Sequence, residues 1–168
     1  ANNAAPALAH AAGLTTEEFL GRMNAKAKAW GLSRTKFTDI HGLDPGNVST
    51  ARELAKMSAQ IFHEYEPVRY VTTRREYTFT TINTGITHTL KTTDKILGSG
   101  LLNSDLQITG GKTGFINESG YTYVLRTASK VTNAQVIVVL LGSSTSAIRF
   151  TDAAAMTNWA FRNYQWQP

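Results

Sequence analysis

The residues with the most chemical content form one short run, Gly110-Gly111-Lys112-Thr113-Gly114. Such a run is typical of a phosphate-binding loop, which also requires a glycine five residues before Gly111 and a helix directly after the threonine. Position 106 is leucine, and the residues after Gly114 favour a strand and a turn. The sequence therefore argues against a phosphate-binding loop.

The same run fits a second kind of site, in which a Lys-Thr-Gly strand borders the cleft of an enzyme with a serine nucleophile. There the Lys112 ammonium would stabilise developing negative charge and bias proton transfer beside the serine. The Thr113 hydroxyl can donate to a substrate carboxylate, and Gly114 leaves room for an extended peptide. Taken alone, the tripeptide fits an ordinary turn with one exposed lysine more often than it fits such a site.

A second candidate nucleophile is Ser33, because Ser33-Arg34-Thr35-Lys36 has the S-x-x-K spacing of a serine and its lysine base. A nucleophile of this type needs a helix start beneath it, so that the serine and the lysine share one face. Here the run follows Gly31, which ends a predicted helix, and no helix is expected after it. We therefore expect a surface turn.

Metal ions and other cofactors are not expected. The histidines are far apart in the sequence, and Pro67 stands where an H-E-x-x-H zinc site beginning at His63 requires its second histidine. The chain has no cysteine, which excludes disulfides, thiolate metal sites and a cysteine nucleophile.

Composition is typical of one globular unit with a single core. The chain has 168 residues, of which 42% are hydrophobic and 17% are charged, and this length buries roughly 70% of the unfolded surface. No apolar run approaches the ~20 residues that cross a bilayer. The net charge of +5 is scattered and carries no nucleic-acid-binding motif, so we expect a solvated surface and no nucleic-acid partner. A site for an anionic polymer such as the cell wall is the less favoured alternative.

The elements that must position the run are helices first and then antiparallel strands. Thr15 with Glu18, and Thr50 with Glu53, are capping signals at the start of two helices. The expected helices span residues 1–12, 16–30, 51–65 and 146–163, and the expected strands span 77–82, 86–90, 111–116, 121–128 and 135–142. The apolar helix faces, which include Trp30, Met57 and Trp159, are expected to lie in the core. The predicted class is α+β, an antiparallel sheet of about five strands flanked by helices.

Five stretches occur in a characteristic order: Asn2-Asn3-Ala4-Ala5, His41-Gly42-Leu43-Asp44, Ser49-Thr50-Ala51-Arg52-Glu53-Leu54, Lys112-Thr113-Gly114 and Asn158-Trp159-Ala160-Phe161. In this order the chain resembles the serine-type D-alanyl-D-alanine carboxypeptidases, the low-molecular-mass penicillin-binding proteins. The resemblance implies a β-lactamase/transpeptidase-like fold over residues 1–168. It also implies that the chain starts inside the S-x-N motif and lacks the upstream S-x-x-K motif with the nucleophile, so that exposed apolar surface is expected where the missing part would pack.

The resemblance also assigns roles to individual residues. Asn2 would be the asparagine of S-x-N, which orients the catalytic groups, and Lys112 would support proton transfer. Thr113 would meet the terminal carboxylate of the substrate, and the backbone N–H of Phe115 would be an oxyanion-hole donor. Arg149 would lie near the carboxylate-binding end of the cleft, with a solvated arginine at a helix start as the alternative. His41 is expected to stabilise a turn rather than act as a base.

The activity that the resemblance implies is removal of the terminal D-Ala from peptidoglycan stem peptides through an acyl-enzyme. The implied partners are those stem peptides, β-lactam antibiotics and the missing N-terminal segment, in a periplasmic or other extracytoplasmic location. Without the nucleophile, the 168 residues alone are expected to be inactive. Two alternatives remain open at this stage, a noncatalytic remnant that binds peptidoglycan peptide and a β-lactamase with an added deacylating base.

Overall fold

The computed structural model of the chain describes residues 4–166. Within this range the helices are α1 (Ala4–Ala11), α2 (Thr16–Ala29), α3 (Ala51–Glu64), α4 (Glu66–Thr72) and α5 (Ile148–Asn163). The strands are β1 (Glu76–Thr80), β2 (Thr87–Lys91), β3 (Leu106–Ile116), β4 (Gly120–Ser129) and β5 (Gln135–Ser143). None of the described helices is long and apolar enough to cross a membrane.

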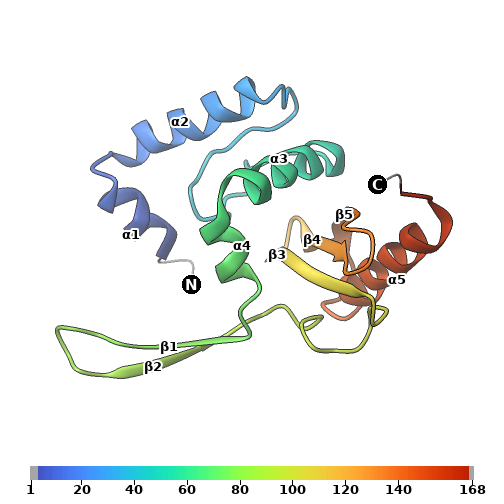
Figure 1. The fold of residues 1–168 in the computed structure, drawn as a ribbon. Helices are drawn as coiled ribbons and strands as arrows, with labels where there is room; N and C mark the ends of the chain where they lie inside the picture. Colours follow the sequence, from blue (N-terminus) through green and yellow to red (C-terminus); the bar gives the residue numbers. More distant parts are fainter. Residues whose placement is uncertain (1–3, 167–168) are drawn as a thin grey trace.

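All strand pairs are antiparallel, which confirms the expected α+β class. The strands form two sheets rather than one, a β1-β2 hairpin and a three-stranded sheet in the order β3-β4-β5. The hairpin projects away from the three-stranded sheet, and every residue in its strands is exposed (Figure 1). β3 begins at Leu106, five residues earlier than expected, and contains a bulge between Ile108 and Gly110. Gly110 and Gly111 interrupt the strand pattern, because glycine is disfavoured in strands, and this hides the start of β3 in the sequence.

The described residues form one helix more than the four expected from the sequence. α3 ends at Glu64, one residue before the expected end, and the additional helix α4 begins at Glu66 with Pro67 in its first turn. Proline is tolerated there because the first N–H groups of a helix have no partner within the helix. Pro67 therefore starts a helix as well as ending one.

The three-stranded sheet carries helices on both faces (Figure 1). On one face α5 packs against the strands and closes the main hydrophobic cluster. The members of this cluster are Ile96, Tyr123, Leu125, Val138, Phe150, Ala153 and Ala154. On the other face α3 approaches so closely that a Cβ at Gly110 would lie 2.6 Å from the Phe62 ring. Side chains alternate between the two faces of a strand, so alternate positions of β3 face the two helical layers.

Not all apolar helix faces lie in the core. Trp30 and Met57 are half-buried, whereas Met156 and Trp159 on the outer face of α5 are 48% and 55% exposed. The expectation of a buried Trp159 is therefore wrong. Its apolar face packs only in part, with the ring edge-on to Tyr164 at a centroid distance of 5.5 Å.

The loop that contains His41 is built around the Asp39 carboxylate. Its oxygens accept hydrogen bonds from the backbone N–H groups of Gly42, Leu43 and Asp44 and from the Asn47 side chain. His41 Nδ1 lies 2.9 Å from Asp39 Oδ2. Burial opposes the charge on Asp39, but these hydrogen bonds outweigh burial and lower the pKa of the carboxyl to about 2. His41 is thus placed as part of a turn, as expected.

Replacing Asp39 with asparagine should change the acid sensitivity of the fold. The folded pKa of about 2 lies below the unfolded value of about 3.9, so the stabilisation is present above pH ~4 and is lost as the pH falls toward 2. After solvent screening we expect about 1 kcal/mol from this group. Urea unfolding should show that Asp39→Asn is less stable at pH 7 and loses less stability than the parent between pH 5 and pH 2. An equal acid loss in both proteins would contradict this assignment.

Candidate functional site

Lys112, Thr113 and Gly114 lie in the second half of β3, which is an edge strand. Within residues 4–166, β3 pairs with β4 alone, and Lys112 lies opposite Val124 and Thr113 opposite Tyr123. The other backbone edge of β3 is unpaired with any described strand. An unpaired edge offers N–H and C=O groups to an extended peptide, which can add as a further strand.

The Lys112 side chain carries a cation in an unfavourable environment. Lys112 is exposed as a residue, but its Nζ folds back to donate to the carbonyl oxygen of Thr113. Desolvation of the ammonium, and then the positive charge of Arg149, lower the pKa of Lys112 below its usual value. The ammonium is therefore a better proton donor than a solvated lysine.

Thr113 points to the opposite face of the strand and is 9% exposed. Its hydroxyl lies 2.7 Å from the hydroxyl of Thr93, which belongs to the loop between β2 and β3. The next residue of that loop, Asp94, is buried and accepts a hydrogen bond of 2.7 Å from the Tyr123 hydroxyl. The loop is thus joined to the sheet by two polar contacts at adjacent loop residues, from Thr93 to the edge strand β3 and from Asp94 to the neighbouring strand β4.

Glycines on β3 allow the loop that contains Asp94, and the neighbouring strand β4, to approach closely. A Cβ at Gly111 would lie 2.8 Å from Asp94 Oδ2 and 3.4 Å from the carbonyl oxygen of Val124, so no larger residue fits without a shift. A Cβ at Gly114 would overlap the Thr122 hydroxyl. The glycine pattern of the run is therefore explained by packing, independently of any ligand.

Asp94 and Tyr123 form a buried acid–phenol pair. Burial raises the pKa of Asp94 above its usual range, and the bond from Tyr123 opposes that rise only in part. Burial, together with the neighbouring carboxylate, holds the pKa of Tyr123 far above its usual value. The phenol therefore stays protonated and remains a permanent donor to Asp94.

Arg149 is buried at the end of the Lys-Thr-Gly segment, with 6% of its surface exposed. Its guanidinium donates to the carbonyl oxygen of Gly114 at 2.9 Å, to that of Thr122 at 3.4 Å and to the Ser146 hydroxyl at 3.2 Å. Its Nε has no hydrogen-bond partner among the described residues. A solvated arginine at a helix start, the alternative considered from the sequence, does not match this burial.

The charge of Arg149 is also poorly compensated. The residue lies in the first turn of α5, a 16-residue helix, where the positive end of the helix dipole disfavours a cation. Its hydrogen-bond acceptors are neutral carbonyl and hydroxyl oxygens, and neither it nor Lys112 has an ion-pair partner in the described part of the chain. Two desolvated cations near one strand end favour the binding of an anion there.

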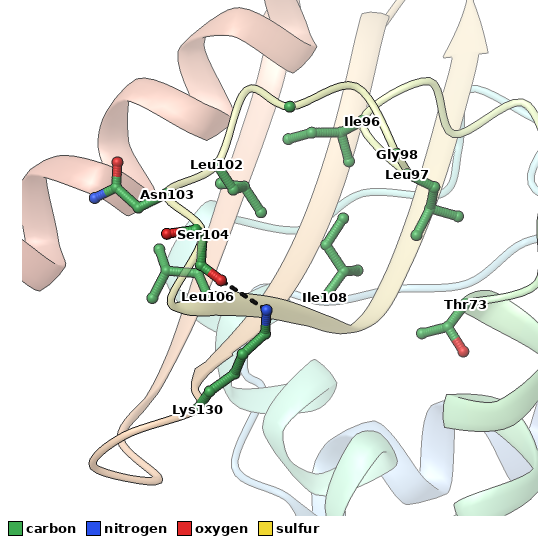
Figure 2. A pocket seen from close by; sticks show the side chains of 11 residues that line it. Thr73, Ile96, Leu97, Gly98, Leu102, Asn103, Ser104, Leu106, Ile108 and Lys130 are labelled. Carbon is green, nitrogen blue, oxygen red and sulfur yellow. Dashed lines mark hydrogen bonds between the residues drawn. The ribbon is translucent and has the colours of Figure 1, made fainter.

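Hollows lie at the two ends of β3. One of about 530 Å³ adjoins the end of the Lys-Thr-Gly segment and is lined by Phe115, Tyr121, Gly142, Ser143 and the β3–β4 turn. The Phe115 ring contacts the Tyr121 ring there at a tilt of 31°, with ring centroids 4.3 Å apart. The other, of about 330 Å³, lies at the start of β3, where Lys130 Nζ donates to the carbonyl oxygen of Ser104 at 2.6 Å (Figure 2). Its lining contains none of the sequence-predicted site residues.

The structure thus brings together Lys112, Thr113, Gly114, Phe115 and Arg149. Asn2, the remaining predicted site residue, lies outside the described residues. Ser33 is placed in a turn where Glu53 binds the Arg34 N–H and the Thr35 hydroxyl, which matches the expected surface turn. In residues 4–166 no group of three or more histidine, aspartate or glutamate side chains is placed to hold a metal ion.

Comparison with known proteins identifies the family. The family model described as D-alanyl-D-alanine carboxypeptidase, peptidase family S11, matches residues 1–145. This chain belongs to the S11 family. The S11 chain is 33% identical over 165 residues to the D-alanyl-D-alanine carboxypeptidase DacC of Escherichia coli, covering 98% of this chain and 38% of that protein. It is 34% identical over 158 residues to the D-alanyl-D-alanine endopeptidase of the same organism, covering 94% of this chain and 49% of that protein.

Solved structures agree with this assignment. The Streptomyces K15 DD-transpeptidase superposes on the S11 chain with a TM-score of 0.76 and 30% identity, covering 87% of this chain and 55% of that one. Penicillin-binding protein D2 from Listeria monocytogenes, in its cefotaxime-bound form, gives a TM-score of 0.70 and 31% identity, covering 86% and 55%. The transpeptidase-like fold is therefore confirmed. The S11 chain spans between 38% and 55% of these relatives, so the activity of a whole enzyme is not carried over directly.

The packing at Gly111 gives a test of the site geometry that needs no ligand. We expect Gly111→Ala to destabilise the S11 chain by about 1–3 kcal/mol, because its Cβ would press on Asp94 and on the backbone of β4. Gly21→Ala is the matched control, since a Cβ at Gly21 meets nothing within 4 Å and alanine favours the α2 helix. Chemical unfolding should separate the two variants. Equal stability of both would contradict the close approach at Gly111.

Proposed function

We propose that the protein containing this chain is a serine-type D-Ala-D-Ala carboxypeptidase that acts on peptidoglycan stem peptides, with its nucleophile outside the 168 residues. The observation that carries the proposal is the positive charge of Lys112 and Arg149, neither of which has an ion-pair partner among the described residues, beside an unpaired strand edge. A stem peptide that ends in D-Ala-D-Ala offers an extended backbone for the edge and a carboxylate for the charge. Family membership supports the same assignment.

In this proposal the peptide lies along the free edge of β3 and ends near Thr113. The Thr113 hydroxyl donates to the terminal carboxylate, and the positive charge of Arg149, which contacts the neighbouring Gly114, stabilises that carboxylate. Gly114 adds no side chain on the strand, so the peptide backbone can approach. These residues bind and orient the substrate rather than react with it.

The chemical steps would be acyl transfer followed by hydrolysis. A serine hydroxyl attacks the carbonyl carbon of the penultimate D-Ala and loses its proton, and the terminal D-Ala leaves as an amine that takes up a proton. Water then cleaves the acyl-enzyme ester. The N–H of Phe115 is proposed as one donor to the oxyanion, and Lys112, with its lowered pKa, supports proton transfer beside the serine. Asn2 is proposed to orient the substrate peptide.

The proposed enzyme is longer than these 168 residues. The chain spans 38% and 49% of the two Escherichia coli relatives, and large apolar side chains such as Met156, Trp159 and Leu141 are exposed on α5 and β5. We propose that further parts of a longer protein cover this surface and supply the nucleophile. An enzyme acting on peptidoglycan would work outside the cytoplasm, and β-lactams would be expected ligands.

A penicillin tests the proposal directly. The longest natural chain that contains these residues should gain the mass of one penicilloyl group on a serine outside the 168 residues, measured by intact-mass and peptide mass spectrometry. Lys112→Met should slow this acylation by a factor of about 10²–10⁴. Lys91→Met, on the exposed strand β2, is the matched control and should acylate at the parent rate.

Other results of the penicillin and peptide experiments would indicate other functions. No adduct and no release of D-Ala from a D-Ala-D-Ala peptide would contradict the carboxypeptidase proposal, and Lys112-dependent binding of that peptide without turnover would indicate a noncatalytic peptide-binding protein. Rapid turnover of penicillin through a short-lived adduct would indicate a β-lactamase. Adduct formation on Ser33 would contradict the placement of the nucleophile outside this chain.

A further inference from the structure

Thr93 is the described residue outside the Lys-Thr-Gly run whose hydroxyl contacts the hydroxyl of Thr113. The two oxygens are 2.7 Å apart, although the residues are 20 positions apart in the chain. Thr113 is buried, whereas Thr93 is exposed on the loop after the β1-β2 hairpin. The contact therefore lies at the boundary between the inner face of the strand and solvent.

The loop that carries Thr93 is fixed on both sides of it. On one side the Thr92 N–H donates to the carbonyl oxygen of Arg75 at 2.9 Å. On the other side Asp94 accepts hydrogen bonds from the Tyr123 hydroxyl at 2.7 Å and from the Ile96 N–H at 3.1 Å. These bonds leave the Thr93 backbone little freedom, so its hydroxyl is held against Thr113 rather than reaching it by chance.

Similar hydroxyl pairs elsewhere in the chain have a simpler explanation. Thr78 with Thr89, at 2.9 Å, and Thr80 with Thr87, at 3.0 Å, are directly opposite one another in the exposed β1-β2 hairpin. Such cross-strand threonine pairs stabilise a sheet locally. Thr93 and Thr113 are not strand partners, because Thr113 is opposite Tyr123. Their contact joins a loop to the candidate site.

The number of protons available decides which hydroxyl donates in the hydrogen bond between Thr93 and Thr113. A threonine hydroxyl has one proton to donate and lone pairs to accept with. If Thr113 donates its proton to a substrate carboxylate, it cannot also donate to Thr93. The bond between the two must then run from the Thr93 hydroxyl to Thr113. A chain of two hydroxyls that ends on a carboxylate is strengthened cooperatively, because each donor polarises the next.

We propose that Thr93 is a positioning residue for substrate recognition: it donates its hydroxyl proton to Thr113 and thereby directs the Thr113 proton toward the terminal carboxylate of the peptide. This inference rests on the proposed carboxypeptidase function and deepens it. Thr93 sets the preference for a peptide with a free C-terminal carboxylate over the same peptide with that group blocked.

The experiment compares two substrates in the longest natural chain. The first is a peptide that ends in D-Ala-D-Ala with a free carboxylate, and the second is the same peptide with its C-terminus as an amide. Thr93→Val keeps the shape of the side chain and removes the hydroxyl. We expect kcat/KM for the free acid to fall roughly tenfold while kcat/KM for the amide changes less than twofold. Thr93→Ser should restore the parent ratio.

Controls separate positioning from folding. Thr89→Val removes a hydroxyl from an equivalent pair in the exposed hairpin and should leave both substrates unchanged. Thr93→Ala replaces Thr93→Val if the latter does not fold, as judged by thermal unfolding. An equal loss for both substrates, no loss for either, or failure of Thr93→Ser to restore the ratio would overturn the role of Thr93. An inactive parent enzyme would instead overturn the proposed function.

Discussion

Buried polar groups hold the inner side of β3, whose free edge is the proposed recognition surface. An edge strand with glycines at positions 110, 111 and 114 is intrinsically soft, since glycine adds backbone freedom and no side-chain packing. Asp94 fixes the neighbouring loop through Tyr123, and Arg149 holds the carbonyl oxygen of Gly114. Gly111, one of the glycines that soften the strand, is also the position that lets Asp94 approach.

These buried groups are coupled electrostatically. Asp94 is buried, and the charge of Arg149 partly offsets the rise in its pKa, while the same charge lowers the pKa of Lys112. Burying charges without complete pairing costs free energy. In the proposed carboxylate site that cost favours binding, because the cations are already partly desolvated before the carboxylate arrives. The local excess of positive charge therefore lowers the free energy of unfolding.

Most elements, and the strand that carries the site, could be predicted from the sequence, because capping pairs, apolar spacing and turn residues act locally. The division of the strands between two sheets could not, since it depends on how far the β1-β2 hairpin reaches from the body. Arg149 could be named by resemblance, but its burial depends on the placement of α5. The local sequence gives no sign of the contacts made by Thr93, Asp94 and Tyr123. A polar loop and a strand with alternating residues have the same local pattern whether or not they contact each other in the fold.

The central claim is that a peptide ending in D-Ala-D-Ala binds along the free edge of β3. Amide hydrogen exchange, measured by mass spectrometry on the longest natural chain with and without a slowly hydrolysed D-Ala-D-Ala peptide, tests it most directly. The account predicts slower exchange over residues 111–116 when the peptide is bound, because backbone groups at the edge gain partners. Binding that leaves exchange over residues 111–116 unchanged and slows it around the hollow at Ile96 and Lys130 would contradict the account.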